Sequence, residues 1–330
     1  MSLRGRLSSA KRNDDILSCI VAAIFVLASC APPPTKTSVP QALSTERIDP
    51  TLAPTVTATF LTATLRPTIP ATDTPVPCDS RSVEYCIVDG NFIFQRPILP
   101  PGNQAIDPTY RFGSTDNGTR DPHHGVEFDN NSGTAVHAAA DGLVVFAGED
   151  KKAIYAPWPN FYGWLVVLQH DDGLFTLYAH LSKINVEAGA KVQLGDQVGA
   201  VGQSGAATGS HLHFEVRSGD GKDYFAAVNP ELWIIPTPTS GAMSLTILDE
   251  ELKFLSAKVT LQHYSAAKEI LGAYYVETYY ASLQTGTENA AITDLPAGSH
   301  RVTLIANGHL YERWVEVQSG KLTQIVIVVN

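Results

Sequence analysis

The sequence predicts an all-β protein, mainly antiparallel, with two successive β domains. The first domain is predicted from short apolar runs separated by Gly, Asp, Asn and Pro, which is the pattern of strands joined by turns. These runs are residues 144–148, 164–170, 174–180, 198–202 and 211–217. No long stretch shows the apolar period of a helix. We assign residues 78–236 to this domain.

A second β domain is assigned to residues 241–330, after a linker that contains Pro and Thr. Residues 257–264 and 300–306 alternate apolar and polar side chains, as half-buried strands do, and 322–329 is a highly apolar run. The pair Asn307-Gly308 is a hairpin-turn signal. This strand spacing over a short segment suits a small β-sandwich.

The N-terminal residues predict export. A basic region precedes a short apolar stretch, Ile16 to Ala28, which cannot span a bilayer as a stable helix but suits a signal-peptide core. The stretch ends in the letters LASC, with Cys30 last, and this string resembles a bacterial lipobox. The resemblance implies that residues 1–29 are a lipoprotein signal peptide and that lipid on Cys30 anchors the protein to the membrane. An ordinary cleaved signal with a chance cysteine is the alternative.

Residues 30–77 are predicted to be a tether. Ten prolines and twelve threonines lie between Ala31 and Pro77, with almost no periodic apolar content. Such a segment cannot bury enough surface to offset its ordering entropy, so we expect a semi-extended chain. A glycosylated stalk is compatible with the same composition.

Two further cysteines, Cys78 and Cys86, stand at the start of the first domain. In an exported protein, an even pair at this spacing predicts a disulfide that closes a short loop. The alternative is that these cysteines bind a metal ion, at a site separate from the histidine clusters described below, although no histidine is nearby in the sequence.

The charge of the chain excludes one class of partner. The formal net charge is −10, and removal of residues 1–29, with four basic and two acidic side chains, would bring it to −12. Nucleic-acid binding depends on a basic surface, so we expect no nucleic-acid partner. The same sign argues against electrostatic attraction to anionic lipid.

Histidines on one predicted strand suggest a metal site. In HLHFEVR (211–217), His211 and His213 share a face and lie about 6.5 Å apart along the strand. That spacing suits one metal ligand and one neighbour that can reach a metal-bound water.

A second histidine cluster, HHGVE, begins at His123 and ends four residues later at Glu127. In a regular strand these two residues would be about 13 Å apart, but Gly125 and the preceding Asp121-Pro122 allow a bend. With a third ligand from the 211–213 strand, they supply two nitrogens and one carboxylate oxygen. This set leaves a position for water, as in catalytic zinc sites.

Four sequence blocks in order resemble the lysostaphin/LytM family of zinc metallopeptidases. They are DPHHGVEF, GTAVHAAADGLVVFAG, YAHL and VQLGDQVGAVGQSGAATGSHLHFEVR, and the resemblance covers roughly residues 105–235. It implies a β-sheet domain with a groove, and zinc-dependent hydrolysis of peptide bonds in the stems or cross-bridges of peptidoglycan. Together with the lipobox, it implies an extracytoplasmic protein that reaches into the cell wall.

The resemblance also implies residue roles. His123, Glu127 and His213 correspond to the zinc ligands, and His180 and His211 to the catalytic pair. His211 would act as general base, and His180 would hydrogen-bond the developing oxyanion or orient the water. Glu127 is a departure, because the family usually has Asp there.

The C-terminal domain resembles prealbumin-like or carboxypeptidase-regulatory-like modules, on the string ITDLPAGSHRVTLIANGHLYERWVEVQSGKLTQIVIVV. We predict no catalytic constellation there. The alternative function is a non-catalytic envelope protein that binds wall peptides or regulates another hydrolase. Retention of all five positions, with one conservative change, favours the enzyme. An adhesin is a weaker third interpretation.

Overall fold

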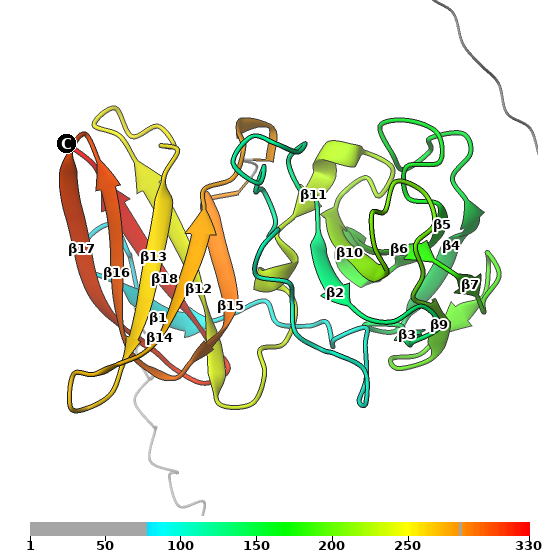
Figure 1. Ribbon diagram of the computed structural model, residues 1–330, viewed down its shortest axis with the longest axis horizontal. Helices are drawn as coiled ribbons and strands as arrows, with labels where there is room; N and C mark the ends of the chain where they lie inside the picture. Colours follow the sequence, from blue (N-terminus) through cyan, green and yellow to red (C-terminus); the bar gives the residue numbers. More distant parts are fainter. Residues whose placement is uncertain (1–77, 284–285) are drawn as a thin grey trace, which may run out of the picture. The chain divides into compact units, whose positions relative to one another are not determined.

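The computed structural model describes residues 78–283 and 286–330 (Figure 1). These residues form β-strands and four short 3₁₀ turns, so the predicted all-β class is confirmed. The signal peptide, the lipidation residue Cys30 and the tether lie outside the described residues. Within 78–283 and 286–330, no helix has the length and apolar character needed to cross a membrane.

The first domain is built on a seven-stranded sheet. Its path is β11-β10-β6-β5-β4-β8, with β2 paired to β10. All of these pairs are antiparallel. The strands are β2 (Val126–Asp129), β4 (Gly142–Glu149), β5 (Trp164–Gln169), β6 (Leu174–Leu181), β8 (Lys191–Val192), β10 (His211–Ser218) and β11 (Ala227–Val228). A smaller sheet joins β3 (Ala135–His137), β9 (Gln197–Ala200) and β7 (Lys183–Ile184).

Strand β10 separates the core of this domain from its polar face. Leu212, Phe214 and Val216 are fully buried in the main apolar cluster, as their alternation predicts. The other face of the same strand carries His211, His213, Glu215 and Arg217, which are also buried. A strand with one apolar and one polar buried face holds its polar side chains in fixed positions, because both sides are packed.

The C-terminal domain is a sandwich of two four-stranded sheets, β1-β18-β12-β15 and β14-β13-β16-β17. Apolar residues of both sheets form its core. In Figure 1 it contains the yellow-to-red strands together with the cyan β1. The strands are β1 (Cys86–Asp89), β12 (Ser240–Leu248), β13 (Lys258–Tyr264), β14 (Ile270–Glu277), β15 (Ala290–Pro296), β16 (Gly298–Ala306), β17 (His309–Val317) and β18 (Lys321–Val328).

The predicted hairpin turn is confirmed, since Asn307 and Gly308 join β16 to β17 with φ angles of 50° and 76°. These positive values fit the two-residue hairpin turns that Asn-Gly favours.

Strand β1 is where the structure departs from the expected organisation. Its residues fall within the range expected for the first domain, but β1 pairs antiparallel with β18 at the edge of the sandwich. The four-residue strand lies far from β18 in sequence, so its pairing could not be read from local pattern. The predicted disulfide, Cys78–Cys86, is present and closes a loop at the start of β1.

Candidate metal centre and catalytic groove

Pairing between β2 and β10 brings together two parts of the site. Their antiparallel register sets Glu127 directly opposite His213. Gly125 permits this approach, because a Cβ there would lie 2.4 Å from the carbonyl oxygen of Phe214 and 3.0 Å from the His213 ring. The close approach of β2 to β10 therefore requires glycine at position 125.

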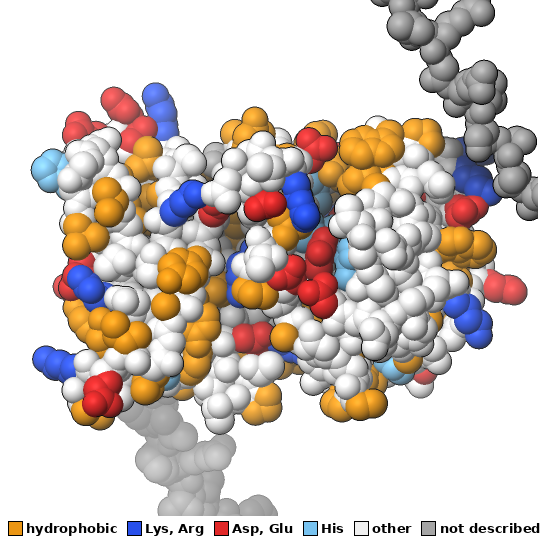
Figure 2. Space-filling model, in the orientation of Figure 1, with side chains coloured by type: hydrophobic (Ala, Val, Ile, Leu, Met, Phe, Trp, Pro, Cys, Tyr) orange, Lys and Arg blue, Asp and Glu red, His pale blue; other side chains and the backbone are white. Residues whose placement is uncertain are grey.

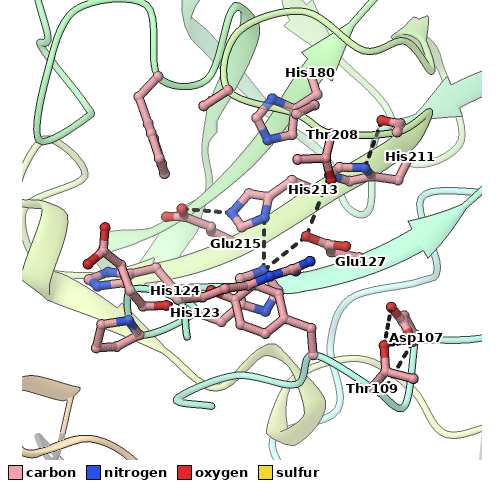
Figure 3. Close-up of a pocket in the computed structure, with 18 of the residues that line it drawn as sticks. Asp107, Thr109, His123, His124, Glu127, His180, Thr208, His211, His213 and Glu215 are labelled. Carbon is pink, nitrogen blue, oxygen red and sulfur yellow. Dashed lines mark hydrogen bonds and ion pairs between the residues drawn. The ribbon is translucent and has the colours of Figure 1, made fainter. Parts of the chain in front are cut away.

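Three side chains predicted as ligands converge. His123 Nε2 lies 3.1 Å from His213 Nδ1 and 3.5 Å from Glu127 Oε1 (Figure 3). One ligand atom from each residue lies within 4.8 Å of the other two. Metal–ligand bonds of about 2.0–2.1 Å in a tetrahedron put neighbouring ligand atoms about 3.3–3.4 Å apart. The spacing of these atoms and their two-nitrogen, one-carboxylate chemistry fit a zinc ion.

The protonation states of these groups fit the same ion. Burial lowers the pKa of His123 well below its usual value, which keeps the imidazole neutral. Metal binding requires neutral imidazoles and an ionised carboxylate. Burial also raises the pKa of Glu127, because a desolvated carboxylate without a cation is disfavoured. A bound cation would stabilise the ionised form.

His180 and His211 stand beside these three residues, with their rings 5.0 Å apart. His180 Nδ1 donates to the Ser204 carbonyl at 2.8 Å, and His211 Nδ1 donates to the Gly209 carbonyl at 3.1 Å. Each neutral ring therefore carries its free lone pair on Nε2. His211 Nε2 is buried, lies 3.5 Å from Glu127 Oε1, and has no hydrogen-bond partner among the described residues.

The surroundings of these two rings keep both imidazoles neutral. The pKa of His180 is lowered to about 3 and that of His211 to about 4, mainly by burial and also by the neighbouring histidines. The backbone of His180 has φ +58° within β6, a conformation that a non-glycine residue rarely adopts. Such strain persists where the surrounding structure holds it, often at functional sites.

Glu215, Arg217 and Tyr162 support the site and were missed by the sequence analysis. His213 Nε2 donates to Glu215 Oε1 at 3.0 Å, which leaves His213 Nδ1 free to bind a metal. The other Glu215 oxygen lies 2.7 Å from Arg217 Nη2, and the Tyr162 hydroxyl donates to Glu215. Burial alone would raise the pKa of Glu215, but Arg217 and the His213 hydrogen bond outweigh it and hold the pKa far below its usual value.

The sequence does contain a signal for Glu215 and Arg217, namely the alternation that places His211 and His213 on one face of the strand. It continues to residues 215 and 217, so an acidic and a basic side chain follow the two histidines on the same face. What the alternation does not show is that this face is buried.

Replacement of Glu215 by Gln is expected to weaken metal binding by about 10- to 100-fold, because the carboxylate that orients His213 is lost. It should also cost about 3–5 kcal/mol of stability, since Arg217 would remain buried without an anion. Metal titration well below the melting temperature separates the two effects. A folded variant with unchanged metal affinity would show that Glu215 does not orient His213.

A groove of about 720 Å³ contains all five predicted site residues. Figure 2 shows carboxylate side chains beside histidine side chains at the middle of this face. The lining also includes acidic and aromatic side chains: Asp107, Tyr110, Asp121, Asp129, Trp158, Phe161 and Tyr224. His124 is buried and stacks on Tyr224, with ring centroids 3.7 Å apart.

Comparison with known proteins finds similarity to a peptidase family over part of the chain. Residues 121–230 match peptidase family M23. A segment of 116 residues is 37% identical to the DD-carboxypeptidase/endopeptidase Mpg of Neisseria meningitidis, over 35% of this chain and 24% of Mpg. A segment of 95 residues is 40% identical to the peptidoglycan DD-endopeptidase ShyA of Vibrio cholerae, over 29% of this chain and 20% of ShyA.

Among solved structures, the catalytic domain of lysostaphin from Staphylococcus simulans is 27% identical, with a TM-score of 0.30. This match covers 46% of this chain and 94% of that domain. The chain thus spans about a quarter or less of the two curated relatives. The family and relatives support a peptidase domain in residues 121–230.

Proposed function

We propose, from the match of residues 121–230 to peptidase family M23, that this chain is a zinc-dependent endopeptidase acting on peptide bonds in bacterial peptidoglycan. The observation that carries the proposal is the convergence of His123, Glu127 and His213 in a groove that also contains His180 and His211. Two relatives are named as peptidoglycan or DD-peptide hydrolases, which supports the substrate class.

His123 Nε2, His213 Nδ1 and a Glu127 carboxylate oxygen would hold the ion. When bound, zinc supplies Lewis-acid chemistry, which polarises a carbonyl and makes water more acidic. The hydrogen bond from His213 Nε2 to Glu215 fixes the ring so that Nδ1 faces the other ligands.

His211 acts as general base in this proposal. Its Nε2 carries a lone pair, faces the Glu127 side of the groove and makes no hydrogen bond to a described residue. A neutral imidazole in this position can accept a proton from water as it attacks the peptide carbonyl.

The tautomer of His180 favours one of its two expected roles. Because Nδ1–H donates to Ser204, Nε2 of the neutral ring can only accept a hydrogen bond. His180 therefore orients the attacking water by accepting from it. It could donate to an oxyanion only after it had gained a proton.

The function is tested by digestion of purified peptidoglycan with the full chain, with and without zinc chelation, followed by mass spectrometry. We expect fragments with cleaved peptides only when zinc is present. His211→Ala is the inactive comparison. His309→Ala is the matched control, because His309 is an exposed histidine of the sandwich. Tight binding to peptidoglycan without cleavage, equal in wild type and His211→Ala, would instead support the non-catalytic envelope protein.

We also propose that Cys30 anchors the chain to the membrane as a lipoprotein. Cys30→Ser should prevent acylation, so the variant should leave the membrane fraction for the soluble extracytoplasmic fraction. Fractionation followed by immunoblotting measures this change. A variant that stays with membranes through detergent-free washing would contradict the lipid anchor.

A further inference from the structure

We infer that the C-terminal β-sandwich positions His123 and thereby supports the peptidase site. This inference rests on the proposed metal site. It assigns a role to the second domain and to Gly113, Ser114 and Tyr279, none of which lies among the converging ligands.

His123 is held by a segment that precedes it in the chain. It lies just before β2, and its backbone makes two hydrogen bonds to this segment: Gly113 N donates to His123 O at 2.8 Å, and His123 N donates to Ser114 O at 3.0 Å. The ring of Tyr110 stacks on the His123 imidazole, with centroids 4.1 Å apart and planes 15° apart. Residues 110–114, which we call the support segment, therefore fix both the backbone and the ring of His123.

The other side of the support segment contacts the sandwich just after β14. Tyr280 N donates to Gly113 O at 3.3 Å, and Ser114 Oγ donates to Glu277 Oε2 at 3.1 Å. The rings of Phe112 and Tyr279 pack edge to face, with centroids 5.0 Å apart, and both are buried. One short segment thus links the end of β14 to His123.

Gly113 shows how close this contact is. A Cβ at Gly113 would lie 2.7 Å from the Tyr279 ring and 2.9 Å from its Cα, and the φ angle of +76° favours glycine independently. The segment cannot move toward the sandwich, and Phe112 resists movement away from it because its ring is buried.

Arg111 adds a second link to the sandwich. Its Nη1 lies 2.5 Å from Glu231 Oε2, and the same oxygen accepts from Thr293 N of β15 at 2.8 Å. Glu231 is fully buried. Loss of one partner from a buried ion pair is strongly destabilising, so this contact resists separation of the segment from β15.

The test compares two substitutions of Tyr279 in the full chain by Co²⁺ titration, with affinity and the d–d absorption spectrum as readouts. Tyr279→Ala removes the ring that holds Phe112 and Gly113, and we expect affinity to fall about 10- to 100-fold, as when groups that orient a ligand are removed. Tyr279→Phe keeps the ring and should retain the wild-type affinity and spectrum. Ser114→Ala, a milder change, should weaken binding in the same direction if Tyr279→Ala fails to fold.

Leu261→Ala is the matched control, because Leu261 is buried in the sandwich core on β13, outside the support segment and its contacts. It should lower thermal stability without changing Co²⁺ affinity at temperatures where the protein is folded. Equal loss of affinity in Leu261→Ala and Tyr279→Ala would overturn the inference, as would unchanged affinity in folded Tyr279→Ala and Ser114→Ala.

A metal-free readout separates this inference from the proposed function. The side-chain ¹⁵N and ¹H NMR signals of His123 should change in metal-free Tyr279→Ala and remain as in wild type in Tyr279→Phe and Leu261→Ala. If wild type binds no Co²⁺, the metal site is wrong, but these signals still test whether the sandwich positions His123. Unchanged signals in Tyr279→Ala would overturn the positioning role.

Discussion

Replacement of His123 or His213 by Ala is expected to abolish stoichiometric zinc binding. Each substitution removes one of the three proposed ligands, and water would then supply most of the coordination of the ion. Activity should be lost with the metal. Metal content after dialysis, measured by atomic emission, checks the first result, and peptidoglycan digestion checks the second.

The corresponding variants of the other two histidines are expected to behave differently. His180→Ala and His211→Ala should keep zinc, because their Nε2 atoms accept protons or orient water in our proposal. Turnover should fall by about 100-fold or more. His309→Ala should be unchanged in both assays. Equal loss of zinc in all four site variants would show that the division between ligands and catalytic residues is wrong.

Removal of the Glu127 carboxylate is expected to weaken zinc binding as severely as loss of a histidine. Glu127 is the one anionic side chain among the three converging residues, and Oε1 lies 3.5 Å from His123 Nε2. Glu127→Ala removes the oxygen. Glu127→Gln keeps its position but not its charge, so it should also bind poorly.

Glu127→Asp should fall between wild type and Glu127→Ala. Aspartate keeps the charge, but its oxygen is drawn back by about 1.5 Å. The backbone of β2 cannot follow freely, because Glu127 is paired with His213 and Gly125 is in close contact with β10. Zinc titration of the three variants distinguishes the cases. Unchanged affinity in Glu127→Ala would remove Glu127 from the site and would favour the non-catalytic alternative.

Sequence reasoning predicted the parts of the site that depend on local geometry. The period of a strand was sufficient to place His211 and His213 side by side on β10, with Leu212 in the core. The bend at Gly125 was also expected. The rest of the site was predicted from resemblance to a family, through the order of four histidines and one glutamate along the chain.

The parts that sequence reasoning missed depend on contacts between distant segments. The register that sets Glu127 opposite His213 joins strands more than eighty residues apart in the sequence. Likewise, nothing local to Cys86–Asp89 shows that it pairs with β18, and nothing local to Gly113 shows that Tyr279 lies against it. The sequence places the charged Glu215 on a strand but does not predict that its side chain is buried.

The position of β18 has a consequence for the order in which the protein matures. This last strand lies between β1 and β12 in its sheet, so it is an inner strand and not an edge. The sandwich therefore cannot close until the C-terminal residues are available, and long-range pairing of this kind is slow. If the sandwich supports His123 as we infer, the metal site would reach its final geometry only after β18 has paired. A growing chain would therefore form the groove before the support for His123 was complete.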